Sequence, residues 1–310
     1  MSFKIGQFSS GDDSFLIIIE NGSVYRFNEG APKTTLDLLQ GCFGAYALSN
    51  KIEILKKNYG YKLFCENLDQ LFKKRCITKP IYPPEVWAVG VTYKRQAMEH
   101  DADLKKRNSE SKGLYSYVYS SERAEVFFKG FNRTCVSTMS PLYLRADSSQ
   151  TMPEAEMVIV LGEDAMPIGY TLGNDLTAWD IETESPLFLN QAKIWDGCSS
   201  IGPFIIPADQ ISDPYDCKLT CKVVRDGEII INSIGDTSQL KRSLEELCYF
   251  LKFNNQVPCG SLLFTGTACL IPHDFALMEN DKVIVEMEEI GQLRNTILIH
   301  KNIERDYNKR

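Results

Sequence analysis

Short runs of apolar residues, bounded by glycine, proline or charged residues, recur along most of the chain. Many alternate apolar and polar positions, as half-buried strands do, and most are too short for a helix. Residues 86–310 are therefore predicted to be mainly β, with a few helices. The predicted strands lie within residues 85–93, 124–131, 155–162, 166–175, 201–207, 218–233, 261–270 and 281–299.

Two dipeptides predict tight hairpin turns. Asn21-Gly22 separates two apolar segments within residues 14–27, and Asp226-Gly227 does the same within residues 218–233. Asn-Gly and Asp-Gly accept the positive φ angles that a two-residue turn between antiparallel strands requires. We therefore expect a hairpin at each position.

Helical patterns are fewer. Residues 237–254 form the clearest amphipathic helix. Its apolar side consists of Leu240, Leu244, Leu247, Cys248 and Leu251. A Lys-rich stretch near 48–75 is also predicted to be helical. Between about 100 and 120 the sequence is polar without a sustained apolar period, which predicts either a mobile lid over a site or an ordinary surface loop.

The prolines of residues 78–85 predict a domain boundary. This stretch, TKPIYPPE, suits an extended linker because proline fixes its own φ and restricts the residue before it. We expect a small N-terminal α/β domain over residues 1–80 and a larger C-terminal domain over residues 81–310. The predicted fold class is then α+β, mainly β.

Composition and charge narrow the class of protein. The 310 residues are 44% hydrophobic and 24% charged, as in ordinary globular proteins. With 34 Lys and Arg against 41 Asp and Glu, the net charge is −7, so we expect no nucleic-acid partner, which would need a basic surface. The apolar run at 15–19 is too short to span a membrane, and the N-terminus lacks a signal-peptide pattern. The expected location is the cytoplasm.

Cysteine spacing indicates free thiols. The 10 cysteines are scattered with no C-x-x-C pair, and the chain has only 3 histidines. Structural zinc sites use closely spaced Cys and His ligands, which this sequence does not offer. We therefore expect reduced thiols, as in a reducing compartment, rather than a zinc site or a disulfide framework.

The segment PEAEMVIVLG carries two carboxylates at the start of a predicted strand. Glu154 and Glu156 are two residues apart, so a strand places them on one face, ~7 Å apart along it. Asp175 follows in a turn-like GND at the end of the next predicted strand. Carboxylates without His or Cys partners suit Mg²⁺ or Mn²⁺. From this pattern alone, a solvated acidic pair and a divalent cation site both remain open.

Longer motifs carry a resemblance to a known family. The string PEAEMVIVLG…IGYTLGNDLTAWDIE…QAKIWDGCSSIGPFI…GSLLFTGTACLI, within residues 83–300, resembles the fumarylacetoacetate hydrolase superfamily. PPEVWAVGVTY, RAEVFFK, PEAEM, SPLFLNQAKI and GPFI are similar to its branch of 2-dehydro-3-deoxy-D-arabinonate dehydratases. The resemblance implies a small N-terminal domain, a C-terminal β-roll with the metal in its mouth, and a homodimer or homotetramer.

The resemblance also implies a metal site and a catalytic residue. The three positions that match the family's Mg²⁺ (or Mn²⁺) ligands are Glu154, Glu156 and Asp175. Lys193 matches the active-site lysine, and its place beside a predicted anionic site favours a catalytic role.

Three further positions match substrate-binding residues of the family: Thr92, Lys129 and Thr267. Residue type leaves alternatives for two of them. Lys129 follows a Phe-Phe pair and is equally compatible with a surface lysine. Thr92 is equally compatible with a strand residue of no special function.

Two departures from the family pattern bear on the reaction. Trp179 stands where Arg is common, so the contacts of that arginine must be replaced or lost. Gln96 stands where the C–C hydrolases carry a His that activates water. A Gln amide cannot take a proton from water, and His100 could replace that base only through a shifted lid. The pattern therefore favours a dehydratase over a hydrolase.

The implied activity is dehydration of a 2-keto-3-deoxy sugar acid by way of a metal-stabilised enolate, with a small 2-oxo acid as the bound partner. The alternatives are C–C hydrolysis of the fumarylpyruvate or fumarylacetoacetate type, oxaloacetate decarboxylation, and an inactive relative that binds a small acid. The general base stays open among Glu99, Asp101, Asp103 and Lys193.

Overall fold

Antiparallel strands build most of this computed structural model, which describes residues 2–107 and 113–299. The strands are β1 (Lys4–Ser10), β2 (Asp13–Glu20), β3 (Ser23–Phe27), β4 (Tyr61–Cys65), β5 (Val86–Gly90), β6 (Glu125–Gly130), β7 (Cys135–Ser137), β8 (Leu142–Leu144), β9 (Thr151–Met152), β10 (Ala155–Leu161), β11 (Pro167–Asp175), β12 (Thr177–Ala178), β13 (Ser199–Pro207), β14 (Lys218–Arg225), β15 (Glu228–Asp236), β16 (Leu262–Thr267), β17 (Lys282–Met287) and β18 (Gly291–Ile299). Each predicted strand range overlaps at least one of them, although β13 begins two residues before its predicted range.

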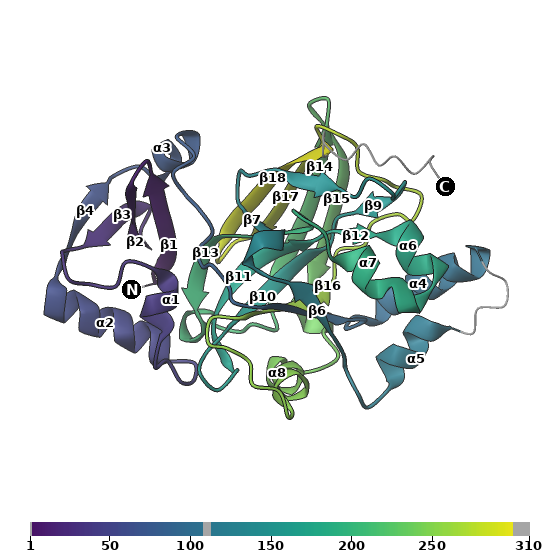
Figure 1. Cartoon of the computed structure of the whole chain (residues 1–310), viewed down its shortest axis with the longest axis horizontal. Helices are drawn as coiled ribbons and strands as arrows, with labels where there is room; N and C mark the ends of the chain where they lie inside the picture. The colour runs from purple at the N-terminus through teal and green to yellow at the C-terminus, as the bar shows by residue number, and fades with distance from the viewer. Residues whose placement is uncertain (1, 108–112, 300–310) are drawn as a thin grey trace, which may run out of the picture.

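Helices are short and lie mostly around the sheets. They are α1 (Thr35–Leu39), α2 (Ala47–Tyr59), α3 (Leu68–Lys73), α4 (Lys94–Arg107), α5 (Leu114–Ser120), α6 (Trp179–Glu184), α7 (Leu189–Lys193) and α8 (Leu244–Lys252). Figure 1 shows the N-terminal strands with α2 at the left, the C-terminal strands in the centre, and α4 to α7 gathered at the right.

Two sheets dominate the topology. The larger runs in the order β4-β3-β2-β1-β13-β11-β10-β16-β5-β6, with β7 also paired to β13. The second runs β15-β14-β17-β18-β8, and β12 pairs with β9 in a small ribbon. Every residue of β10 is buried, because Ile159 packs into the core shared with β14 and β17 while Val158 packs into the core on the other face. Because both faces of such a strand are buried, its sequence is a nearly continuous apolar run.

Both predicted hairpin turns are confirmed. Asn21 and Gly22 have φ angles of 50° and 79° between β2 and β3, and Asp226 and Gly227 have 51° and 89° between β14 and β15. Two successive positive φ angles match the right-handed twist of the strands that they join.

Two helix predictions need correction. The predicted helix at 237–254 begins only at Leu244, because the side chain of Ser243 accepts a hydrogen bond from Glu246 N and caps it there. The Lys-rich stretch at 48–75 is not one helical segment, since β4 separates α2 from α3. Gly60, with a φ of 69°, ends α2 and lets the chain turn into that strand.

The polar stretch at 100–120, predicted as a loop, is largely helical. It holds the end of α4 and all of α5, while residues 108–112 lie outside the described residues. The apolar period is missing because the buried face of α4 includes polar side chains, among them Gln96 and Asp103. The carboxylate of Asp101 accepts hydrogen bonds from the backbone N–H groups of Tyr115 (2.9 Å) and Ser116 (2.8 Å), which ties α4 to the start of α5.

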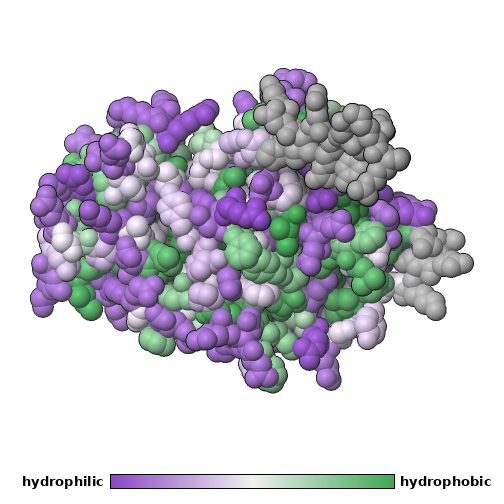
Figure 2. Space-filling view, in the orientation of Figure 1, coloured by the Kyte–Doolittle hydropathy of each residue, from purple (hydrophilic) through white to green (hydrophobic). Residues whose placement is uncertain are grey.

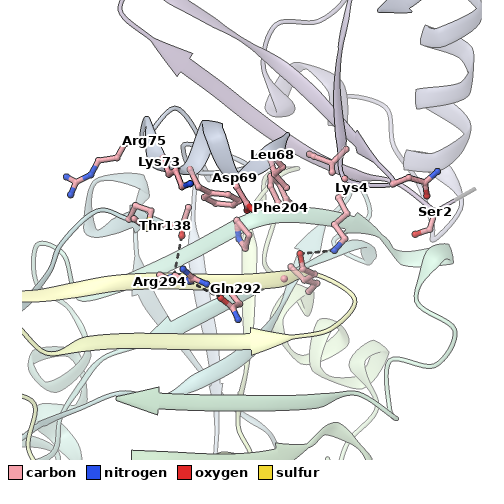
Figure 3. A pocket seen from close by; sticks show the side chains of 18 residues that line it. Ser2, Lys4, Leu68, Asp69, Lys73, Arg75, Thr138, Phe204, Gln292 and Arg294 are labelled. Atoms are coloured by element: carbon pink, nitrogen blue, oxygen red, sulfur yellow. Dashed lines mark hydrogen bonds between the residues drawn. The ribbon is translucent and has the colours of Figure 1, made fainter. Parts of the chain in front are cut away.

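The N-terminal strands continue the sheet of the C-terminal part. β1 pairs with β13 through Ile5 and Ile205. Beside this junction lies a cavity of about 900 Å³, lined by Lys4, Phe72, Phe204 and Arg294 among others (Figure 3). The predicted domain boundary near residue 80 stays a prediction.

The described helices include none that is long and apolar enough to cross a membrane. Figure 2 shows polar and apolar residues interspersed over one face of the molecule.

Candidate active site

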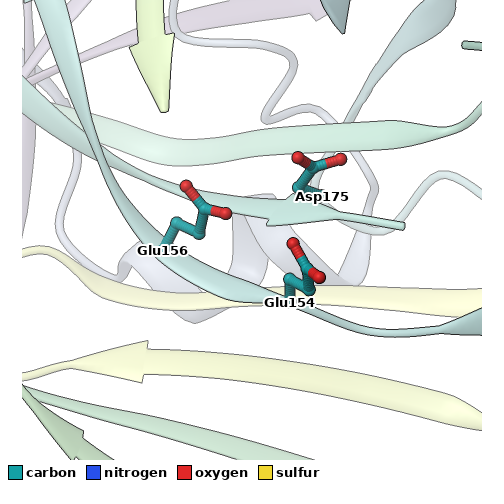
Figure 4. Close-up of side chains that lie close together, drawn as sticks. All are labelled: Glu154, Glu156 and Asp175. Atoms are coloured by element: carbon teal, nitrogen blue, oxygen red, sulfur yellow. The ribbon is translucent and has the colours of Figure 1, made fainter. Parts of the chain in front are cut away.

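Three carboxylates converge where β10 begins and β11 ends. Glu156 lies in β10 and Asp175 closes β11, and the antiparallel register pairs Ala155 with Asn174. Asp175 N donates to the Glu154 carbonyl at 2.9 Å, which fixes the third carboxylate beside the other two. One oxygen from each carboxylate lies within 4.8 Å of the others (Figure 4). Because the Glu154 side chain is only 13% exposed and Glu156 only 2%, the solvated-pair interpretation is wrong.

Lys129 supports Asp175 from beneath the site. Its side chain is 0% exposed, so the surface-lysine alternative is also wrong. The ammonium lies 2.5 Å from Asp175 Oδ1 and donates to the backbone carbonyls of Leu176 (3.1 Å) and Lys193. With three acceptors around it, Lys129 fixes both a predicted ligand and the end of α7.

Lys193 lies among the same carboxylates. Its ammonium is 2.9 Å from Glu154 Oε2 and 3.5 Å from Asp175 Oδ2. It also donates to Thr177 Oγ1 at 2.6 Å. Burial lowers the pKa of Lys193, but Asp175, Glu154 and Glu182 more than offset this and hold that pKa well above its usual value. Lys193 is therefore a cation at neutral pH in the metal-free protein, and in that form it cannot act as a base.

The crowding of carboxylates affects the pKa of Glu156 most directly. Burial raises its pKa well above the usual value, and repulsion from Asp175 and Glu154 raises it further. The backbone N–H of Gly266 donates to Glu156 Oε2 at 2.7 Å. Gly266 has a φ of 89°, and a Cβ there would overlap the hydroxyl of Thr92. The glycine of the TGT motif is thus needed to bring that N–H to the carboxylate.

Two more carboxyl groups line the same cavity. Glu125, on β6, pairs in register with Gly90 on β5. Its carboxylate lies over Gly90, where a side chain on residue 90 would collide with it. Glu182, on α6, accepts a hydrogen bond from the Tyr115 hydroxyl at 3.0 Å through Oε1, and its buried Oε2 has no partner among the described residues. Burial raises the pKa of Glu125 and raises that of Glu182 to about 7.

Helices α4, α5 and α6 close the cavity with aromatic rings. Trp179 is 1% exposed, and its ring centre lies 4.4 Å from that of His100 and 4.9 Å from that of His273. Trp179 Nε1 donates to Asp103 Oδ2 at 2.9 Å. Trp179 occupies the position where the family usually has arginine, and its ring joins α6 to α4 through these contacts. The enclosed space is only about 30 Å³, far below the roughly 300–1,000 Å³ of ligand pockets.

The remaining predicted substrate residues lie around this cavity without lining it. Thr92 is buried and donates to the Thr265 carbonyl at 2.7 Å. Thr267 pairs with Glu156 in register, and its hydroxyl accepts from Cys269 N at 3.1 Å. Their substrate contacts, and that of Lys129, stay predictions.

Three base candidates from the polar stretch are engaged elsewhere. Asp101 caps α5, and Asp103 accepts hydrogen bonds from Trp179 and Arg107. Glu99 pairs with Arg95 at 3.1 Å. Sequence reasoning missed Glu125 and Glu182, although Glu125 lies in the RAEVFFK motif that carries the family resemblance.

Comparison with known proteins identifies the family. Residues 85–298 match the family model described as "Fumarylacetoacetate (FAA) hydrolase C-terminal". The chain belongs to the fumarylacetoacetate hydrolase family. Over 217 residues it is 38% identical to the 2-dehydro-3-deoxy-D-arabinonate dehydratase of Saccharolobus solfataricus, which covers 70% of this chain and 72% of that protein. Over 232 residues it is 36% identical to a probable 2-keto-3-deoxyxylonate dehydratase of Haloferax volcanii, covering 74% and 78%.

Solved structures confirm the fold class and extend the likeness to the N-terminal part. A 2-keto-3-deoxy-D-arabinonate dehydratase complexed with magnesium and 2,5-dioxopentanoate is 29% identical, with a TM-score of 0.81. The match covers 96% of this chain and 99% of that one. The mainly β, fumarylacetoacetate-hydrolase-like architecture predicted from the sequence is therefore confirmed.

The residues of this family member fit magnesium. All three donors are carboxylates, which a hard cation prefers to thiolate or imidazole. Their crowding also leaves negative charge that two ammonium groups do not cancel. Glu154, Glu156 and Asp175 are therefore the residues that would hold Mg²⁺.

We predict that Glu156→Gln weakens Mg²⁺ binding and stabilises the metal-free protein. The raised pKa of Glu156 gives stability that is complete below about pH 4.3, the ordinary Glu pKa, and is lost as pH rises through the folded-state pKa. Gln imitates the protonated form at every pH. The melting temperature without metal should therefore exceed that of the wild type at pH 8, while calorimetry should show Mg²⁺ affinity reduced by at least about tenfold.

Glu184→Gln is the matched control, because Glu184 is exposed at the end of α6 and does not line the cavity. It should change neither quantity. Unchanged Mg²⁺ affinity in Glu156→Gln would remove Glu156 from the ligand set.

We predict that Gly266→Ala destabilises the protein more than Gly227→Ala. Both glycines have a φ of 89°, so each substitution places alanine in the left-handed region at a cost of about 1–2 kcal/mol. Only at residue 266 does the added Cβ also meet Thr92, since nothing lies within 4 Å of the position at residue 227. Urea denaturation of both variants measures the difference, and equal losses would show that the Thr92 contact is unimportant.

Proposed function

We propose that this protein is a Mg²⁺-dependent hydro-lyase that dehydrates a 2-keto-3-deoxy sugar acid of the 2-dehydro-3-deoxy-D-arabinonate type. The observation that carries the proposal is one closed cavity that combines a three-carboxylate cation site, a fixed lysine cation and two carboxyl groups of raised pKa. Relatives with more than a third of their residues identical are named as dehydratases of such acids.

The metal and Lys193 would hold the 2-oxo acid end of the substrate. Bound Mg²⁺ supplies Lewis-acid polarisation of the substrate oxygens. Lys193 adds a positive charge that is already in place beside Glu154 and Asp175. Such a preorganised charge stabilises negative charge that develops on the substrate at little reorganisation cost. Lys129 is buried against Asp175 and acts as a positioning residue. Thr92 and Thr267 are proposed to contact the substrate.

Glu125 and Glu182 divide the proton transfers. Burial raises the pKa of Glu125, and the charge of Lys193 partly offsets this. We assign Glu125 as the base that removes the C3 proton. Burial raises the pKa of Glu182 most, Lys193 lowers it, and repulsion from Glu154 and Glu125 raises it, to about 7, so Glu182 keeps its proton below neutral pH. Glu182 then donates that proton to the C4 hydroxyl, which leaves as water. Pairs of carboxyl groups with separated pKa values are a common arrangement for acid–base work.

The hydrolase alternative lacks a competent base. His100 does line the cavity, but its neighbours are the rings of Trp179, Tyr115 and His273 rather than an orienting carboxylate. Burial, His273 and Lys193 together lower the pKa of His100 well below its usual value. A weakly basic imidazole of this kind is poorly suited to deprotonating water.

We also propose a cytoplasmic homodimer or homotetramer. All 10 cysteines are free thiols, most of them buried, which suits a reducing compartment. Light scattering after size-exclusion chromatography would give the mass relative to the 35.1 kDa chain.

A substrate panel tests the proposed function. With Mg²⁺ present, a 2-keto-3-deoxy pentonate should lose water and give 2,5-dioxopentanoate, which an aldehyde dehydrogenase detects. Acylpyruvates should react slowly, because Gln96 stands where the hydrolases carry the His that activates water. Oxaloacetate tests the decarboxylase alternative in the same panel. Efficient acylpyruvate cleavage without dehydration would reverse the conclusion, and no turnover of any acid would favour the inactive relative.

We predict that kcat/KM falls above about pH 7, as Glu182 loses the proton that it must donate. Glu182→Gln should lower the rate by about 10²–10⁴ and remove this limb of the pH profile, with Mg²⁺ affinity kept. Glu184→Gln should retain both the rate and the profile. An unchanged profile in Glu182→Gln would assign the ionisation to another group.

A further inference from the structure

Helix α4 turns two polar side chains toward the candidate active site, and neither forms a hydrogen bond with another described residue. Gln96 and His100 are one helical turn apart and both line the cavity that holds the three carboxylates. Both also line a smaller cavity of about 20 Å³ next to it, toward Thr267. Gln96 is 6% exposed, and its Oε1 is buried without a hydrogen-bond partner among the described residues.

His100 is fixed in orientation but free to bind. Its ring centre lies 4.4 Å from Trp179, 4.9 Å from Tyr115 and 5.1 Å from His273, so aromatic rings from three other segments surround it. Within the described chain, no hydrogen bond engages its ring nitrogens. Because burial and neighbouring charges lower the pKa of His100, the ring is neutral and offers one donor and one acceptor.

An unpartnered buried amide is costly, at about 1–3 kcal/mol, unless a ligand satisfies it. The chemistry of the pair restricts that ligand. A neutral amide and a neutral imidazole each donate and accept, as a hydroxyl group does, whereas a distal carboxylate would call for a cation. The charged anchors of the cavity, Lys193 and the metal ligands, belong to the other end of the substrate.

We propose that Gln96 and His100 bind hydroxyl groups of the substrate chain and so select hydroxylated over hydroxyl-free 2-oxo acids. The assignment rests on the proposed function of the same site. It gives the glutamine at residue 96 a specificity role, and it makes Trp179 a positioning residue that holds the imidazole edge toward the cavity. Acylpyruvates with a distal carboxylate are then disfavoured at recognition as well as at the chemical step.

The experiment compares two ligands in two variants. Gln96→Met and His100→Phe keep the approximate size of each side chain and remove its hydrogen bonds. With Mg²⁺, each should raise KM for a 2-keto-3-deoxy pentonate by about tenfold. The inhibition constant of 2-oxopentanoate, which has the same chain length and no hydroxyl, should stay within about twofold. Met98→Leu, on the exposed side of α4, is the control and should change neither value.

Thermal melting of the metal-free proteins gives a second readout. Gln96→Met removes an unsatisfied amide, so its melting temperature should rise while its affinity for the sugar acid falls. A structural role for Gln96 would give the opposite shift in stability. Equal weakening of both acids, or an unchanged KM for the sugar acid in both variants, would overturn the inference.

The inference and the proposed function fail separately. If the wild type does not dehydrate the sugar acid, the proposed function is wrong. Calorimetry of the 2-keto-3-deoxy pentonate and of 2-oxopentanoate still tests whether Gln96 and His100 bind hydroxyl groups. Tighter binding of the hydroxylated acid that disappears in Gln96→Met supports the pair, whereas equal binding of both acids to the wild type refutes it.

Discussion

The mutual repulsion of three carboxylates is the constraint around which the rest of this site is arranged. Glu154, Glu156 and Asp175 bring oxygens within 4.8 Å of one another in a place that water scarcely reaches. Two ammonium groups offset most of that charge, and one negative charge remains. In the metal-free protein the raised pKa of Glu156 lets a proton neutralise it. A divalent cation replaces the proton and overshoots to a net positive charge, which suits an anionic 2-oxo acid.

The two lysines divide this work because their surroundings differ. The Lys129 ammonium donates to Asp175 and to two backbone carbonyls, which hold it in the core. It thereby fixes the position of the Asp175 carboxylate. One of those carbonyls belongs to Lys193, so the position of Lys193 depends on Lys129. Lys193 faces the cavity with Glu154 and Thr177 as partners, and a substrate carboxylate can compete for its ammonium. Neither role can be exchanged without moving a strand or a helix.

The sequence predicted the β framework well because its signals are local. The turn dipeptides at Asn21 and Asp226 and the apolar runs of β10 and β11 each specify a feature within a few residues. It predicted α4 and α5 poorly because these helices bury polar groups, so the apolar period that marks a helix is absent. It also left open whether Lys129 is buried, since a lysine after two phenylalanines is usually exposed. The acid–base pair that we propose, Glu125 and Glu182, depends on contacts between distant segments, as between Tyr115 and Glu182, and no local pattern predicts these.

The small cavity connects the reaction to the departures from the family pattern. A space of about 30 Å³ is smaller than a five-carbon acid, so we expect side chains of α4, α5 or α6 to shift when substrate enters. Trp179 joins these helices, through the rings of His100 and Tyr115 and through its hydrogen bond to Asp103. Closure of this kind excludes bulk water, which strengthens every charge interaction inside. A hydrolase must admit a water molecule and activate it, whereas a dehydratase only releases one. A tryptophan in the lid and a glutamine in place of a base are therefore consistent with each other, because both suit chemistry in which water is a product.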